Sequence, residues 1–103
     1  MRIIVTDRAE EKLQDNIGYI IEQFGGKSKK EFIGEFRNIL KLLLKNPNMG
    51  FIEPLLNERP IMYRSIVMNR YNKIIYRITD DLIEIVDFWD TRREPKEQAA
   101  KLN

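Results

Sequence analysis

Basic side chains that could hold a phosphate group are concentrated in the second half of the chain. Arg64, Lys73 and Arg77 fall within apolar, β-branched segments, and Arg92 and Arg93 directly follow the last of these segments. A guanidinium donates two parallel hydrogen bonds to a phosphate, and cations of this kind stabilise the charge that develops when a phosphodiester is cleaved. The two adjacent arginines therefore raise three possibilities, namely a catalytic site, a binding surface or an ordinary solvated strand end.

Each of these cations also has an ordinary structural interpretation. An arginine pair that follows Asp90 is typical of a solvated strand end, where a surface ion pair contributes less than about 1 kcal/mol. Lys73 and Arg77 could instead pair across a hairpin with carboxylates such as those of Glu84 and Asp87. The residue types alone leave both interpretations open.

Two residue types that commonly carry out catalysis are missing from the chain. It contains no histidine and no cysteine, which excludes the usual serine and cysteine triads and argues against a structural zinc site. Proton transfer would have to come from Glu53, Glu58, Asp90 or Tyr71. We expect no metal and no cofactor.

Length and composition correspond to one globular domain, residues 1–103. The chain is 43% hydrophobic and 33% charged, with a net charge of +2 that is too small to indicate a nucleic-acid-binding protein by itself. No apolar run approaches the roughly 18 residues that a membrane span needs, and the first residues become polar too early for a signal peptide. We therefore expect a cytoplasmic protein without a membrane partner.

Two amphipathic helices are predicted in the first half of the chain. Apolar residues recur at three- and four-residue spacing over 9–24 and again over 32–44. Asp7 and Ser28 each precede a glutamate by three residues, which predicts that they cap the two helices. Consecutive glycines at 25 and 26 end the first helix, and a join of three residues makes the pair an antiparallel hairpin.

Four strands are predicted around this hairpin. The first covers 2–6, and after a proline-rich loop at 47–61 the others cover 62–68, 72–79 and 82–90. The last three are joined by such short turns that only antiparallel pairing is possible. Both faces of the strand at 82–90 are largely apolar, which indicates a central strand or one covered on both sides.

Alternation along 72–79 separates two sets of side chains. Ile74 and Tyr76 share the face that the helices would cover, whereas Lys73, Ile75 and Arg77 share the opposite face. Two helices can cover only one side of a small sheet, so the second face is predicted to be open and concave. The fold class is therefore α+β, with a βααβββ order and the helical hairpin on one face of a small twisted antiparallel sheet.

Four segments in this order resemble those of a known protein family. They are IGYIIEQFGGKSKKEFIGEFRNILKLLLKNPNMG at 17–50, YRSIV at 63–67, YNKIIYRITDD at 71–81 and IEIVDFWDTRREP at 83–95. Together they cover nearly the whole chain, which is similar to toxins of the RelE/ParE superfamily from bacterial type II toxin–antitoxin systems. The resemblance implies a cognate antitoxin whose extended C-terminal segment wraps the toxin.

Two activities divide that superfamily, and the fold does not decide between them. ParE-like members bind and poison DNA gyrase, whereas RelE-like members cleave mRNA in the ribosomal A site. For a RelE-like endoribonuclease, the resemblance implies catalytic contacts from Arg64, Lys73 and Arg92 or Arg93, with the arginine pair as a phosphate clamp at the edge of the sheet. Ribosome-dependent members typically carry a tyrosine near the C-terminus, yet nothing after Trp89 is aromatic. This absence favours the gyrase inhibitor, with the endoribonuclease as the alternative.

A binding surface is expected on the open side of the sheet. Arg77, Trp89, Asp90 and Tyr71 are its candidate residues, and Trp89 would fill the groove or the core rather than stack on a base. An apolar, cationic groove of this kind would fit an acidic, amphipathic antitoxin segment, bound as a helix or an added strand. A third hypothesis is a family member that retains antitoxin binding alone.

Overall fold

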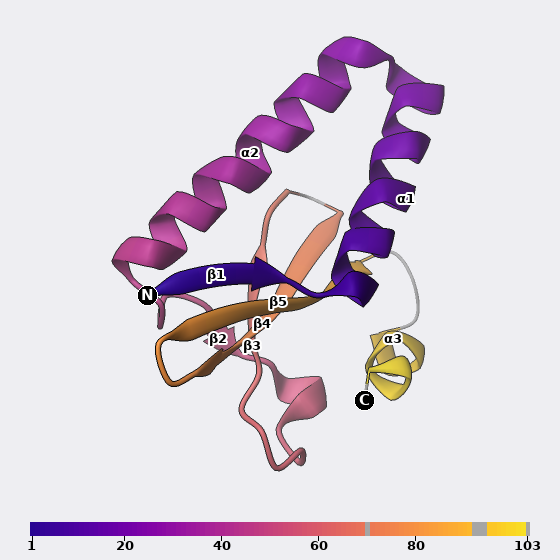
Figure 1. Ribbon diagram of the computed structural model, residues 1–103. Coiled ribbons are helices and arrows are strands. Elements are labelled where there is room, and N and C mark those ends of the chain that lie inside the picture. Colours follow the sequence, from indigo (N-terminus) through magenta and orange to yellow (C-terminus); the bar gives the residue numbers. More distant parts are fainter. Residues whose placement is uncertain (70, 92–94, 103) are drawn as a thin grey trace.

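The first half of the chain forms two long amphipathic helices. In the computed structural model, which describes residues 1–69, 71–91 and 95–102, α1 spans Asp7–Phe24 and α2 spans Gly26–Lys45. Figure 1 shows the helices meeting at one end and diverging over the same side of the sheet. Their buried stripes are Ala9, Leu13, Ile17, Phe32, Phe36, Ile39 and Leu43. The predicted helical hairpin is confirmed.

The helix boundaries differ from the prediction at two points. Thr6, not Asp7, caps α1, because its Oγ1 accepts a backbone N–H of the first turn at 3.3 Å. The second helix begins before Ser28, so this serine lies inside the first turn and caps nothing. Gly25 alone joins the helices, and its φ of +88° is a conformation that side-chain-bearing residues rarely adopt.

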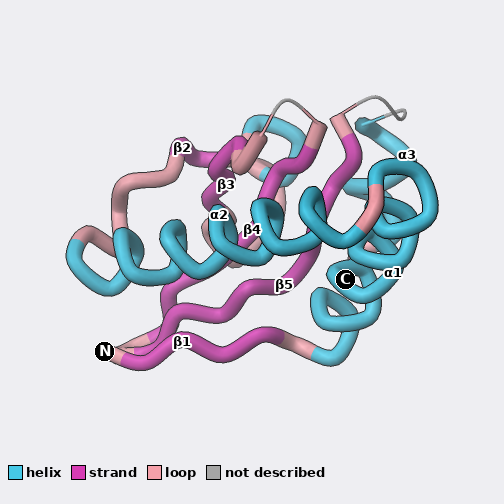
Figure 2. Tube along the Cα trace, turned by 90° about the horizontal axis from the view of Figure 1, so that it is seen from above, coloured by secondary structure: helices cyan, strands magenta, loops and turns pink. Residues whose placement is uncertain are grey.

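The sheet within the described residues has the strand order β1-β5-β4-β3-β2. The strands are β1 (Arg2–Val5), β2 (Phe51–Ile52), β3 (Arg64–Val67), β4 (Asn72–Thr79) and β5 (Leu82–Asp90). The predicted antiparallel meander is formed by β3, β4 and β5, whereas β1 pairs in parallel with β5 and makes the sheet mixed. As expected from its apolar faces, β5 is an internal strand. Figure 2 shows α2 running across the sheet.

A β-bulge in β5 changes which of its side chains share a face. The register shifts between Ile75 and Tyr76, which leaves Val86 without an opposite residue in β4. An extra residue reverses the alternation beyond it. Phe88 therefore joins the core under the helices, and Trp89 joins the core on the other side. The strict alternation predicted for this strand is wrong after Val86.

The face of the sheet opposite the long helices is covered. The 3-10 turn η1 (Pro54–Leu56) and the helix α3 (Pro95–Lys101) pack over it and over each other (Figure 1). They enclose a second core of Leu56, Tyr63, Ile75, Val86, Trp89, Ala99 and Leu102. The expectation of an open concave surface with Ile75 and Trp89 exposed is therefore wrong.

Arg59 secures this cover by binding the end of α3. Its Nη1 donates to the carbonyl oxygen of Leu102 at 2.7 Å, and its Nη2 donates to that of Ala99 at 2.8 Å. A cation at a helix C-terminus satisfies carbonyl groups that have no partner within the helix. Within the described residues, no helix combines the length and hydrophobicity needed to cross a membrane.

Candidate functional site

Lys73 and Trp89 are neighbours on the covered face of the sheet. They are opposite each other in the β4–β5 register, and the Lys73 Nζ atom lies 5.6 Å from the centroid of the Trp89 ring. The same ammonium is 2.7 Å from Oε2 of Glu53, whose side chain is 1% exposed. Because an aromatic ring and a buried carboxylate both attract a cation, Lys73 is held between them and its charge is neutralised.

Glu53 is positioned by the turn that follows β2. Its backbone N–H donates to the Tyr63 carbonyl at 2.9 Å, and its Oε1 accepts the N–H of Leu55 at 3.4 Å as the cap of η1. Oε2 accepts no well-aligned hydrogen bond, so the ammonium of Lys73 satisfies it as an ion pair. The sequence indicated Glu53 only as a candidate for proton transfer and did not predict this pairing.

Arg64 lies on the other side of the sheet from Lys73. It is opposite Tyr76, which belongs to the core under the helices, whereas Lys73 is opposite Trp89 of the second core. Arg64 Nη1 donates to the carbonyl oxygen of Gly50 at 2.8 Å and so holds the loop that follows α2. The structure therefore does not bring Arg64 and Lys73 to a common phosphate position.

Tyr76 ties the same loop from inside the core. Its hydroxyl donates to the Pro47 carbonyl at 2.8 Å and accepts the N–H of Gly50 at 2.9 Å. Burial raises the pKa of the Tyr76 phenol. The hydroxyl thus remains a neutral donor and acceptor that fixes the start of the 47–50 loop.

Arg77 pairs with Glu84 across the β4–β5 hairpin, as one of the two interpretations of the sequence predicted. Arg77 Nη2 lies 3.1 Å from Glu84 Oε2, and Thr79 donates to Oε1 at 3.0 Å. The hydrogen bond to Glu84 raises the pKa of Arg77, and the hydrogen bond from Arg77 lowers the pKa of Glu84. Both shifts favour the charged pair.

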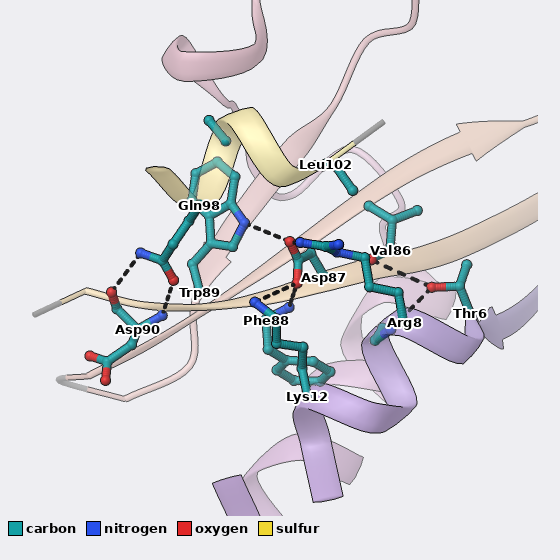
Figure 3. A network of polar contacts seen from close by, with 12 residues as sticks. Thr6, Arg8, Lys12, Val86, Asp87, Phe88, Trp89, Asp90, Gln98 and Leu102 are labelled. Atoms are coloured by element: carbon teal, nitrogen blue, oxygen red, sulfur yellow. Dashed lines mark hydrogen bonds and ion pairs between the residues drawn. The ribbon is translucent and has the colours of Figure 1, made fainter. Parts of the chain in front are cut away.

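Trp89 and Asp90 connect the end of β5 to the covering elements. The Trp89 side chain is 2% exposed, so it belongs to the core. The backbone N–H of Asp90 donates to Gln98 Oε1 at 2.8 Å, and its carbonyl accepts from Gln98 Nε2 at 2.9 Å. Figure 3 shows the side-chain amide of Gln98 beside the backbone of Asp90, where it continues the hydrogen-bond pattern of the sheet. Gln98 was not among the residues that the sequence singled out.

Tyr71 lies in the turn between β3 and β4. Tyr71 is 42% exposed, and its carbonyl accepts the N–H of Thr91 at 2.9 Å. Arg92 and Arg93, the predicted phosphate clamp, lie outside the described residues. Among the candidates that the structure describes, Lys73, Trp89 and Asp90 share one region, whereas Arg64, Arg77 and Tyr71 lie in three others.

Asp87 is the centre of a buried network that the sequence did not predict. The carboxylate is inaccessible to solvent and accepts from the Phe88 backbone N–H and the Trp89 Nε1, both at 2.9 Å. Arg8 Nε and Lys12 Nζ, one turn apart on α1, lie 3.3 and 3.4 Å from its oxygens (Figure 3). Two features of the sequence could have indicated this network. One is an acidic residue inside an apolar strand, and the other is a pair of basic residues four positions apart on a helix.

Solved structures with this architecture define the class of the fold. The chromosomal ParDE toxin–antitoxin system from P. aeruginosa matches with a TM-score of 0.70 and 19% identity, over 87% of this chain and 95% of that chain. The YoeB/ParE toxin from Agrobacterium tumefaciens matches with a TM-score of 0.58 and 14% identity, over 87% and 98%. YafQ from E. coli strain BL21(DE3) matches with 0.53 and 13%, over 87% and 92%. The chain has the fold of type II toxins.

The family model described as the ParE toxin of the type II toxin–antitoxin system, parDE, matches residues 3–95. This chain therefore belongs to the ParE toxin family of the RelE/ParE superfamily. Family membership implies a cognate protein antitoxin as its partner. No curated protein sequence matches the chain.

Proposed function

We propose that this toxin inhibits DNA gyrase by binding it, without catalysis of its own, and that a cognate antitoxin neutralises it. The observation that carries the proposal is the match to the ParE family over residues 3–95. In this proposal both the toxicity and its control are protein–protein interactions, because the toxin binds gyrase and the antitoxin binds the toxin.

The arrangement of the described cations supports binding over RNA cleavage. Lys73 is neutralised by Glu53, and Arg64 is on the other side of the sheet with its guanidinium on a loop carbonyl. Phosphodiester cleavage needs several cations around one transition state and a group that moves protons. The chain contains no histidine for that task, and its candidate Glu53 is occupied by the ion pair.

The open edge of β3 supplies a surface for the antitoxin. Strand β2 pairs only with Arg64 and Ser65, so Ile66 and Val67 have no neighbouring strand on that side among the described residues. An apolar groove beside this edge includes Phe51, which is 82% exposed, and Val67, which is 60% exposed. Exposed apolar side chains on an unpaired edge favour the addition of a partner strand. The antitoxin segment therefore extends the sheet here.

Two assays with the purified protein test the proposed activity. Incubation with purified gyrase and plasmid DNA should block supercoiling and accumulate cleaved DNA complexes, and an excess of the antitoxin should reverse both effects. Translating ribosomes incubated with the same preparation should keep their mRNA intact. Codon-dependent mRNA cleavage without any effect on gyrase would overturn the proposal and identify an endoribonuclease.

A further inference from the structure

A small basic cavity lies beside the end of α3 and plays no part in the proposed toxin activity. It encloses about 220 Å³. Three cationic side chains line it from three elements, namely Arg8 of α1, Arg77 of β4 and Lys101 of α3. Tyr63 and Leu102 contribute to its wall, and none of the described residues that line it is acidic. The cavity is thus built for a small anionic group.

Both arginines of this cavity carry buried N–H groups without a well-aligned hydrogen bond among the described residues. Nε and Nη2 of Arg8 and Nε of Arg77 are inaccessible to solvent and have no hydrogen-bond partner among the described residues. The 3.3 Å approach of Arg8 Nε to Asp87 is an ion pair without hydrogen-bond alignment (Figure 3). Buried donors are nearly always satisfied in folded proteins, and these two guanidiniums, which already lie close to Asp87 and Glu84, retain donor capacity for a further acceptor.

The charges around the cavity do not balance. Arg77 has Glu84 as its carboxylate, but Asp87 is shared between Arg8 and Lys12 of α1. The exposed ammonium of Lys101 has no ion-pair partner in the part of the chain that the structure describes. Among the described residues, the three cations that line the cavity therefore exceed the carboxylates that pair with them, and a bound anion would reduce the mutual repulsion.

We propose that this cavity binds a phosphate group. The three cations that line the cavity belong to separate elements, which suits a tetrahedral anion whose oxygens point in different directions. A planar carboxylate is best recognised by the fork of one guanidinium, and the forks of Arg8 and Arg77 are already partly used by Asp87 and Glu84. The phosphate group comes either as the free ion or as the ester of a nucleotide.

Calorimetric titration of the purified chain with inorganic phosphate at low ionic strength tests the site. Saturable binding is expected for the wild type, and Lys101→Gln should weaken it by about three- to tenfold. Lys41→Gln is the matched control, because it removes the same charge from an exposed position on α2, on the other side of the sheet. This control should bind phosphate like the wild type.

A second variant tests the contribution of Arg77 and leaves no unpaired carboxylate behind. Arg77→Gln combined with Glu84→Gln removes both members of the ion pair, and its binding should be weaker than that of Lys101→Gln by a further factor of about three or more. Thermal unfolding of each variant confirms that the fold persists. Adenosine monophosphate binding more tightly than phosphate would identify an ester as the ligand, and equal binding would identify the free phosphate group.

Three results would overturn the proposal. The first is an absence of saturable phosphate binding, which would mean that the three cations do not form an anion site. The second is an equal loss in Lys41→Gln and Lys101→Gln, which would indicate general charge attraction. The third is acetate binding as tightly as phosphate, which would identify the cavity as a site for a carboxylate of an acidic protein partner.

Discussion

The Nζ atom of Lys73 lies 2.7 Å from Oε2 of Glu53, beneath the cover of η1. This pair joins β4 to the turn that starts η1, so it holds the cover on the sheet. From the sequence, Lys73 is a candidate for phosphate contact or for an ion pair across the hairpin, and Glu53 is one of four candidates for proton transfer. Their direct contact gives both a structural role.

Removal of one member of this pair should cost more than removal of both. Glu53→Gln leaves the ammonium without its carboxylate and should lower the free energy of unfolding by about 1–3 kcal/mol, less than for a fully buried pair because Lys73 is 25% exposed. Adding Lys73→Met should restore part of this loss. Urea unfolding of the single and double variants measures the coupling, and additive effects would contradict it.

Gly50 should not tolerate a side chain. A Cβ atom there would lie 2.7 Å from the Tyr76 ring and hydroxyl and 2.9 Å from the Ser65 carbonyl. Gly50→Ala should therefore destabilise the protein by about 1–3 kcal/mol. Gly34→Ala is the control, because Gly34 is in α2 with nothing within 4 Å of its added Cβ. This second variant should stabilise the protein by about 0.5–1 kcal/mol, and equal unfolding midpoints for both variants would contradict the expected clash.

The Arg77–Glu84 pair should make the stability of the protein depend on pH in the acidic range. The pKa of Glu84 is lowered by its hydrogen bond from Arg77, so its contribution is present above the usual value of 4.5 and is lost as pH falls through the lower, folded-state pKa. Glu84→Gln should be less stable than the wild type at pH 7, and the difference should shrink below about pH 4.5. Denaturant unfolding across this range measures it. A difference that stays constant with pH would show that the carboxylate charge contributes nothing.

Phe51 should be needed for antitoxin binding and not for folding. Its side chain is 82% exposed on β2, so Phe51→Ser should leave thermal unfolding unchanged and weaken antitoxin binding by roughly tenfold or more. Phe24→Ser, at a side chain 67% exposed on the end of α1, is the control. Calorimetry with the purified cognate antitoxin measures both. Equal losses in the two variants would exclude the β3 edge as the docking site.

The elements with strong periodicity were predictable from the sequence. Apolar spacing located α1 and α2, and alternation placed Ile74 and Tyr76 under them. These signals are reliable because one wide apolar face must be buried along the whole element. The strands of the meander were predictable for a related reason, since their two-residue period and short turns permit only one mode of pairing.

The apolar faces of the strand at 82–90 allowed for cover on both sides, but the elements that provide it could not be located from the sequence. The 3-10 turn η1 is three residues long and α3 is seven, so neither repeats an apolar pattern often enough to be placed by it. Partners such as Glu53 for Lys73 and Gln98 for Asp90 are distant in sequence, and only the folded chain brings them together. The bulge at Val86 likewise depends on pairing, which one strand alone does not reveal.

The unpaired residue at Val86 has a consequence for reading relatives of this chain. Deleting it would let β5 run as a regular strand and would exchange the inward and outward positions of everything that follows, Phe88 and Trp89 included. Consider two homologues of which only one has this extra residue. An alignment of their last strands that ignores it would match interior residues of one protein with exterior residues of the other. Roles near the C-terminus should therefore be transferred between toxins by counting from the bulge, not from the hairpin.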